Sequence, residues 1–218
     1  MTVRACMARF AFPDRLYPIA DAGAARAGLD VVTLAESILA AGTRLLQLRA
    51  KELPSGEFVA VARAVQARAR RAGARLIIND RADVARLVGA AGVHLGQDDL
   101  PAAAARDMLG SDAIIGLSTH DAAQLDAAVR GGGIDYVAFG PIFPTTSKRN
   151  PDPVQGLSAL AAVRPRCPMP LVAIGGIDAG SIAAVLAAGA DAAAVIGAIS
   201  GAADPHAATR ALLRAAGL

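Results

Sequence analysis

Short apolar runs alternate with longer, Ala-rich amphipathic segments along most of the chain, and each apolar run ends at polar or glycine residues. Runs of this length that are rich in Val, Ile and Leu are typical of buried β-strands. The pattern predicts eight strands: Leu16–Ala20, Arg44–Leu48, Arg75–Ile78, Gly92–Leu95, Ala113–Leu117, Tyr136–Phe139, Leu171–Ile174 and Ala192–Ile196.

The segments between these strands carry apolar residues at helical spacing, so helices are expected to fill the gaps. Gly42, Gly73 and Gly189 should end three of them, because glycine readily adopts the left-handed conformation that follows many helices. The clearest predicted helices are Leu34–Ala41, Ser55–Ala72, Ala82–Gly89, Ala122–Arg130, Ser181–Ala188 and Pro205–Ala216.

Eight strand–helix units without a Pro-rich or Ser-rich linker predict one α/β domain, a (β/α)8 TIM barrel over residues 1–218, with residues 1–13 as an N-terminal extension. A doubly wound open sheet is the alternative. It is disfavoured because no GxGxxG motif follows the first strand, and because the Gly-rich turns lie in the last quarter of the chain, where barrels commonly bind phosphate.

Composition and charge narrow the classes of function. The net charge of +3 is the balance of 22 Lys and Arg against 19 Asp and Glu, and the basic residues are mostly arginines scattered along the chain. Arg70 and Arg71 fit the solvated face of a helix, so no nucleic-acid partner is expected. Cys6 and Cys167 form no CxxC motif, which favours reduced thiols. We expect no membrane segment and a cytoplasmic location, because no apolar run is long enough to span a bilayer and no signal peptide is evident. A homo-oligomer remains possible.

Gln47, Arg49 and Lys51 follow an apolar run and should project from the carboxyl end of the second strand. Active sites of (β/α)8 barrels lie at this end of the strands, so an amide and two cations there suggest a phosphorylated ligand. The alternative is a solvated strand terminus.

Two carboxylates follow the next two strands. Asp80 comes after the third strand and Asp99 after the fourth, and the pair would suit Mg²⁺, with water and phosphate oxygens completing its ligands. As an alternative, Asp80 could simply cap the following helix. His94 lies within the fourth strand, where a hydrogen-bonded structural role is favoured over a catalytic one.

The remaining strand ends carry hydroxyls and glycines. Ser118 and His120 follow the fifth strand, but a Ser-His-Asp triad is disfavoured because there is no GxSxG motif, so Ser118 is expected to donate a hydrogen bond to phosphate. The long connection after the sixth strand carries hydroxyls and Lys148, and it could bind phosphate or be a solvated loop. Gly175 and Gly176 could admit a phosphate or form a simple strand-ending turn.

Seven motifs at successive strand ends resemble those of the thiamine phosphate synthase family in order and spacing. The resemblance runs from about Gln47 to Ile199 and implies a common ancestor. The motifs are QLRAK, IND, HLGQDD, GLSTH, GPIFPTTSK, AIGGI and AVIGAI.

The resemblance implies a Mg²⁺-dependent (β/α)8 enzyme that joins hydroxymethylpyrimidine diphosphate to hydroxyethylthiazole phosphate, or to its carboxylated precursor, with release of diphosphate. Small phosphorylated substrates are its implied partners. It implies that the pyrimidine diphosphate is bound by Gln47, Leu48, Arg49, Ala50, Lys51, Asn79, Ser118 and Lys148, with Arg49, Lys51, Ser118 and Lys148 in catalytic roles. It also implies that Mg²⁺ is bound by Asp80 and Asp99, and the thiazole phosphate by Thr145, Thr146, Ser147, Gly176, Ile196 and Gly197.

Two positions depart from the family pattern. Ser147 stands where many relatives have threonine, and Gly197 stands where serine is common, so weaker thiazole-phosphate binding is expected. Two other readings stay open: a thiazole tautomerase paralogue with the same barrel, and a non-catalytic barrel that binds phosphate ligands. The joint presence of Arg49, Lys51 and the two carboxylates favours the synthase.

Overall fold

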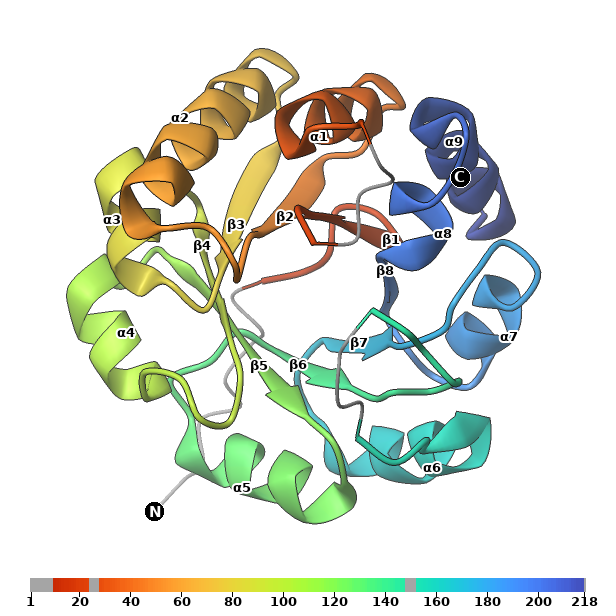
Figure 1. The fold of residues 1–218 in the computed structure, drawn as a ribbon. Helices are drawn as coiled ribbons and strands as arrows, with labels where there is room; N and C mark the ends of the chain where they lie inside the picture. The colour runs from red at the N-terminus through yellow and green to blue at the C-terminus, as the bar shows by residue number, and fades with distance from the viewer. Residues whose placement is uncertain (1–9, 24–27, 148–151, 218) are drawn as a thin grey trace.

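The computed structural model describes residues 10–23, 28–147 and 152–217, which form a closed barrel of eight parallel strands surrounded by helices (Figure 1). The predicted (β/α)8 barrel is confirmed. The doubly wound alternative is wrong, because the first strand pairs in parallel with both the second and the eighth, which leaves the sheet no free edge. In the described part of the chain, no helix is long and apolar enough to cross a membrane.

All eight predicted strands are present, and no boundary differs from its prediction by more than two residues. The strands are β1 (Leu16–Asp21), β2 (Leu45–Arg49), β3 (Arg75–Asn79), β4 (Gly92–Leu95), β5 (Ile114–Thr119), β6 (Tyr136–Phe139), β7 (Leu171–Ile174) and β8 (Ala192–Val195). Several end one or two residues later than expected, because main-chain pairing with a neighbouring strand continues into the polar residues that we assigned to loops.

The six predicted helices are also present. The first begins three residues early, at Val31, because Asp30 caps it by accepting hydrogen bonds from the amides of Val32 and Thr33. The helices are α1 (Val31–Ala40), α2 (Ser55–Arg71), α3 (Ala82–Val88), α4 (Ala102–Leu109), α5 (Ala122–Gly131), α6 (Gly156–Val163), α7 (Ile182–Ala187), α8 (Gly197–Ser200) and α9 (Pro205–Ala215), with a short 3-10 helix, η1 (Arg164–Arg166). Gly42, Gly73 and Gly189 have positive φ and follow helix ends, as predicted.

Two hydrophobic layers hold the fold together. The larger layer lies between the outer face of the strands and the helices, and the smaller one fills the barrel interior. The interior is closed at the amino ends of the strands by Phe10 and Phe12, whose rings lie 5.6 and 5.1 Å from that of Tyr136. Farther along the strands the interior side chains include Ala138 and Ala194, which are too small to fill the space and line a cavity instead.

Close packing between strands generates a prediction about Gly92 in β4. A Cβ atom there would lie 1.8 Å from the carbonyl oxygen of Ile114, so Gly92→Ala should lower the free energy of unfolding by about 3 kcal/mol. The control is Gly56→Ala in the first turn of α2, where a Cβ atom meets nothing within 4 Å, and a gain of about 0.5–1 kcal/mol is expected. Urea unfolding measures both, and equal stabilities of the two variants would contradict this packing.

Candidate active site

A cavity of about 950 Å³ opens at the carboxyl ends of the strands, and every strand or the loop after it contributes to its lining. The structure brings most of the sequence-predicted site residues together here. Those that line the cavity are Gln47, Arg49, Lys51, Asn79, Asp80, Asp99, Ser118, Thr145, Thr146, Ser147, Gly176, Ile196 and Gly197. Lys148 lies outside the described residues.

The side chains of Leu48 and Ala50 do not line the cavity. They are buried in the layer between strands and helices, because alternate residues of a strand point to opposite faces of the sheet. Gln47 and Arg49 point into the barrel by the same rule. Any contact of Leu48 or Ala50 with a ligand would therefore involve their main-chain atoms.

Lys51, Asp80 and Asp99 form a charged cluster at the ends of β2, β3 and β4. The Lys51 Nζ lies 3.0 Å from Asp80 Oδ2, and Asp99 Oδ2 accepts a hydrogen bond from the Gly96 amide at 2.6 Å. Burial, together with a hydrogen bond to Asp99, raises the pKa of the Asp80 carboxyl, and Lys51 opposes this rise. Among the residues that the structure describes, the cluster thus has two acidic side chains in contact and Lys51 as the cation paired with them.

The backbone at Asp80 is unusual. Its φ is +62°, the only positive value at a described non-glycine residue, and this conformation costs about 1 kcal/mol or more. The reading of Asp80 as a helix cap is wrong, because the cap position of α3 belongs to Arg81 and no side chain bonds to that helix end. The strained backbone turns Asp80 toward Lys51 instead.

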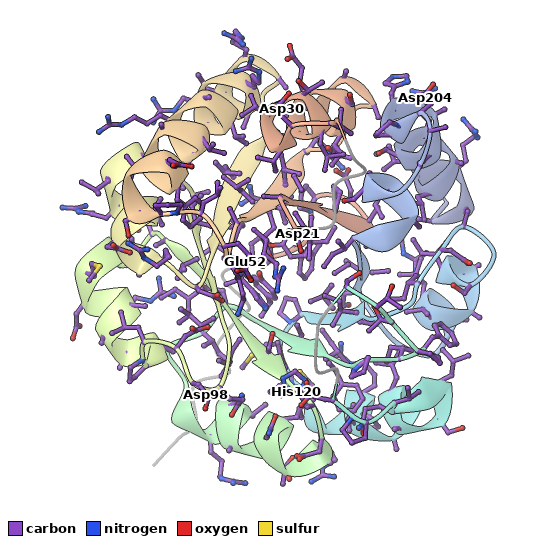
Figure 2. The ribbon with its side chains drawn as sticks, viewed as in Figure 1. Asp21, Asp30, Glu52, Asp98, His120 and Asp204 are labelled. Carbon is purple, nitrogen blue, oxygen red and sulfur yellow. The ribbon has the colours of Figure 1, made fainter. Side chains whose placement is uncertain are left out.

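Arg49 is held by a residue that sequence reasoning missed. Arg49 Nη1 pairs with Asp21 Oδ2 at the end of β1, and the other oxygen of Asp21 accepts a hydrogen bond from the Gly23 amide. Figure 2 shows Asp21 over the central part of the ring of strands. The available signal was an acid directly after a predicted strand, the same pattern that pointed to Asp80. Because only 1% of the Asp21 side chain is exposed, the pair fixes Arg49 at the barrel mouth.

His94 is hydrogen-bonded inside the barrel, as its place within a strand predicted. Its Nδ1 lies 2.9 Å from the hydroxyl of Tyr136 and its Nε2 lies 2.9 Å from Ser118 Oγ. Burial lowers the pKa of His94 to about 4, so the ring is neutral near pH 7. A Ser-His-Asp triad needs a carboxylate on the second nitrogen of the histidine that bonds to the serine. His94 bonds to Ser118, but its other nitrogen bonds to Tyr136, so these contacts form no triad.

His120 lies beside α5 (Figure 2), where its main-chain amide donates to the Gln124 side chain at 2.8 Å. Its Nδ1 is 3.0 Å from the carbonyl oxygen of Gly140 and 3.4 Å from Asp152 Oδ2. Ser118 and His120 were grouped by one motif, yet their side chains have different partners.

The part of the cavity formed by the loops after β6, β7 and β8 is rich in hydroxyls and glycines, and Asp152 and Asp178 also line it. A Cβ atom at Gly175 would lie 2.4 Å from Pro141 Cβ, and one at Gly176 would lie 2.4 Å from the carbonyl oxygen of Pro144. Both glycines are therefore needed for the β7–α7 turn to pack against the loop after β6. A Cβ atom at Gly197 would lie 3.5 Å from Ser147 Oγ, so the loop after β6 also reaches the start of α8. Phosphate binding by these groups stays a prediction.

Comparisons with known proteins agree with this geometry. The family model described as thiamine monophosphate synthase matches residues 16–199. A putative thiamine-phosphate synthase of Geobacter sulfurreducens is 44% identical over 198 residues, which cover 91% of this chain and 92% of the relative. The thiamine-phosphate synthase of Laribacter hongkongensis is 44% identical over 191 residues, covering 87% of this chain and 90% of the relative.

A solved structure gives the same result. Thiamine phosphate pyrophosphorylase from Pyrococcus furiosus superposes with a TM-score of 0.82 at 32% identity, and the match covers 93% of this chain and 95% of that one.

Proposed function

The chain belongs to the thiamine monophosphate synthase family, and we propose that it is a thiamine-phosphate synthase that couples hydroxymethylpyrimidine diphosphate to hydroxyethylthiazole phosphate and releases diphosphate. With the carboxylated thiazole phosphate as substrate, CO₂ leaves as well. Both substrates are small phosphorylated molecules, and we expect the reaction to take place in the cytoplasm.

One observation carries the proposal: the cavity has a charged part and a hydroxyl-rich part. Arg49, Lys51, Asp80 and Asp99 lie at the ends of β2 to β4, whereas most hydroxyls and glycines of the lining come from the loops after β6, β7 and β8, which also carry two carboxylates. A substrate that carries a diphosphate fits the charged part, and one that carries a single phosphate fits main-chain amides and hydroxyls.

The charged part is suited to stabilise a departing anion. As the bond between the methylene carbon and the diphosphate oxygen breaks, negative charge grows on the diphosphate and positive charge on the carbon. Arg49 and Lys51, with Lys148 assigned from sequence, would stabilise the diphosphate, and the aminopyrimidine ring would delocalise the positive charge. The thiazole nitrogen then forms the new bond to the methylene carbon.

No general base is needed for this step, because the attacking thiazole nitrogen carries no proton. The environment of His94 supports this reading, since the ring is neutral and bonded through both nitrogens to Tyr136 and Ser118. Ser118 is proposed to hold the pyrimidine substrate by a hydrogen bond, and Asn79 to bind its diphosphate.

Asp80 and Asp99 would bind magnesium. Two carboxylates that share a hydrogen bond, one with a raised pKa, form a site where a divalent cation could replace the shared proton. Among the residues whose placement is described, no group of three or more potential metal-binding side chains exists, so water and substrate oxygens would supply the other ligands. When bound, magnesium supplies positive charge at the diphosphate oxygens.

The two competing functions explain less of the site. A thiazole tautomerase would have no diphosphate to stabilise, so Lys51, Asp80 and Asp99 would have no role. A barrel that only binds a phosphate ligand would not require the strained backbone that turns Asp80 toward Lys51.

We predict that Asp80→Ala lowers turnover by about a hundredfold or more, because the variant loses a magnesium ligand and the partner of Lys51. Lys148→Ala should have an effect of similar size. Thiamine phosphate and diphosphate are measured after both substrates are mixed with the protein and Mg²⁺. The control is Asp83→Ala, which removes an exposed carboxylate paired with Arg81 and should leave the rate near that of the wild type. Absence of product with the wild type would end the proposal, and near-normal rates in both variants would refute the assigned roles.

A second prediction concerns magnesium. Because the proposed metal site consists of two carboxylates, Asp80 and Asp99, Mg²⁺ should bind weakly to the protein alone and about tenfold or more tightly when inorganic diphosphate is present. Isothermal titration calorimetry with and without diphosphate measures this difference. Asp99→Asn should make the difference between the two Mg²⁺ affinities smaller. Equal affinities of the wild type with and without diphosphate would contradict the prediction that the protein and diphosphate bind the ion together.

A third prediction concerns Gly197. Serine fits here, since a Cβ atom makes only an ordinary contact with Ser147, and its hydroxyl would supply the phosphate donor that many relatives have. Gly197→Ser should therefore lower the KM for thiazole phosphate by about threefold to tenfold. Gly197→Ala is the matched control, because it adds the carbon without the hydroxyl. An unchanged KM in Gly197→Ser would contradict the placement of the thiazole phosphate.

A further inference from the structure

A continuous chain of five polar side chains crosses the barrel interior, and both of its ends line the cavity. Gln47 Nε2 lies 3.0 Å from the Tyr17 hydroxyl, which lies 3.0 Å from the Tyr136 hydroxyl. From there the chain continues through His94 to Ser118, with 2.9 Å for each contact. We call these five residues the interior chain. Its first four members are buried.

The hydrogen bonds of the interior chain run in one direction. An amide NH₂ group can only donate, so Tyr17 accepts from Gln47. Among the described residues the Tyr17 hydroxyl has one other partner, the Tyr136 hydroxyl, so we assign its hydrogen to that contact, with Tyr17 donating to Tyr136. Tyr136 then donates to His94 Nδ1, which must be unprotonated to accept. A neutral imidazole with a bare Nδ1 carries its hydrogen on Nε2, so His94 donates to Ser118 Oγ.

This direction decides what each end offers to a ligand. Ser118 Oγ accepts from His94, so its own hydrogen is left to point into the cavity as a donor. Gln47 uses its amide nitrogen inside the barrel, and its carbonyl oxygen has no hydrogen-bond partner within the described ranges. The cavity therefore receives one donor and one acceptor whose identities are fixed by three residues beneath them.

The packing around Tyr136 makes the interior chain possible. Gly116 of β5 lies between His94 of β4 and Tyr136 of β6 in the strand register. A Cβ atom at Gly116 would lie 2.1 Å from Tyr136 Cζ and 2.4 Å from its hydroxyl, so only glycine lets this hydroxyl reach His94. Because Phe10 and Phe12 pack against the Tyr136 ring, it is held in that position.

A purely structural role explains the interior chain poorly. Phenylalanine at the tyrosine positions would bury the same ring without the need to satisfy two hydroxyls in an apolar interior. The hydroxyls also bond only to members of the same chain in the part that the structure describes. Their evident effect is to connect Gln47 with Ser118.

We propose that Tyr17, Tyr136 and His94 are positioning residues that lock Gln47 as an acceptor and Ser118 as a donor toward the substrate. The inference rests on the proposed function and deepens it, because this pattern matches an aminopyrimidine, whose amino group donates and whose adjacent ring nitrogen accepts. A 4-oxopyrimidine presents the opposite pattern, an N–H donor and an oxygen acceptor. The interior chain thus selects the amino form of the substrate and rejects the oxo form.

The tautomer of His94 tests the direction without any ligand. Two-bond ¹H–¹⁵N correlation spectra of the labelled, full-length protein near pH 7 distinguish the two neutral forms of histidine. The protein has three histidines, so the signal of His94 is assigned as the one that is missing from the spectrum of His94→Gln. We expect the form with hydrogen on Nε2. The form with hydrogen on Nδ1 would mean that the hydrogen bonds of the interior chain have the opposite direction, and it would overturn the proposal.

The selectivity test uses Tyr136→Phe, which removes the donor to His94 Nδ1 and frees the ring to change tautomer. Discrimination between the aminopyrimidine diphosphate and its 4-oxo analogue, measured as the ratio of kcat/KM, should fall about tenfold, and the KM for thiazole phosphate should stay unchanged. Tyr17→Phe releases the Gln47 end and should also reduce discrimination, while His94 keeps its tautomer.

Thr119→Val is the matched control. It removes a buried hydroxyl of β5, the strand that carries Ser118, and this hydroxyl donates to the Ala138 carbonyl outside the interior chain. The free energy of unfolding should therefore fall, while discrimination between the two pyrimidines stays unchanged. Unchanged discrimination in Tyr136→Phe, or an equal loss in Thr119→Val, would refute the positioning role. If the wild type forms no thiamine phosphate, the proposed function fails; the tautomer and the relative binding of the two pyrimidines, measured by calorimetry, then still decide whether the interior chain sets the polarity.

Discussion

Closure of eight parallel strands into a barrel is the constraint on which the site depends. Side chains alternate along each strand, so every second residue points to the interior, and closure brings the carboxyl ends of all strands around one cavity. Gln47 and Arg49 face this cavity, while Leu48 packs beneath the helices. One geometric rule thereby assigns residues next to each other in sequence either to chemistry or to the core.

The chemistry of the cavity follows from how its charges are held. Arg49 is fixed by the buried carboxylate of Asp21, whereas Lys51 and Asp80 pair near the surface, where Lys51 keeps about half of its side chain exposed. A buried cation pair and a half-exposed one suit a site that must hold diphosphate and then release it. The neutral interior chain beneath them adds no charge, and we propose that it sets Ser118 as a donor and Gln47 as an acceptor.

Most of the fold was predictable from sequence, because the strands are short apolar runs and their alternation with helices is regular. The residues that line the cavity were largely predictable for the same reason, since polar residues follow each run. The partners of those residues were not. Tyr17 and Tyr136 are 119 residues apart and read as core positions, and the hydrogen bond between them follows only from strand register and the missing side chain at Gly116. The positive φ of Asp80 likewise has no signal in the residue type alone.

The central claim is that one cavity holds a diphosphate at its charged part and a monophosphate at its hydroxyl-rich part. A crystal structure with Mg²⁺, inorganic diphosphate and thiazole phosphate tests it most directly. The account predicts diphosphate against Arg49 and Lys51 with the metal ion between it and the carboxylates of Asp80 and Asp99, and thiazole phosphate beside Ser147 and Gly197. Diphosphate bound away from this cluster, or both ligands in one part of the cavity, would contradict the account.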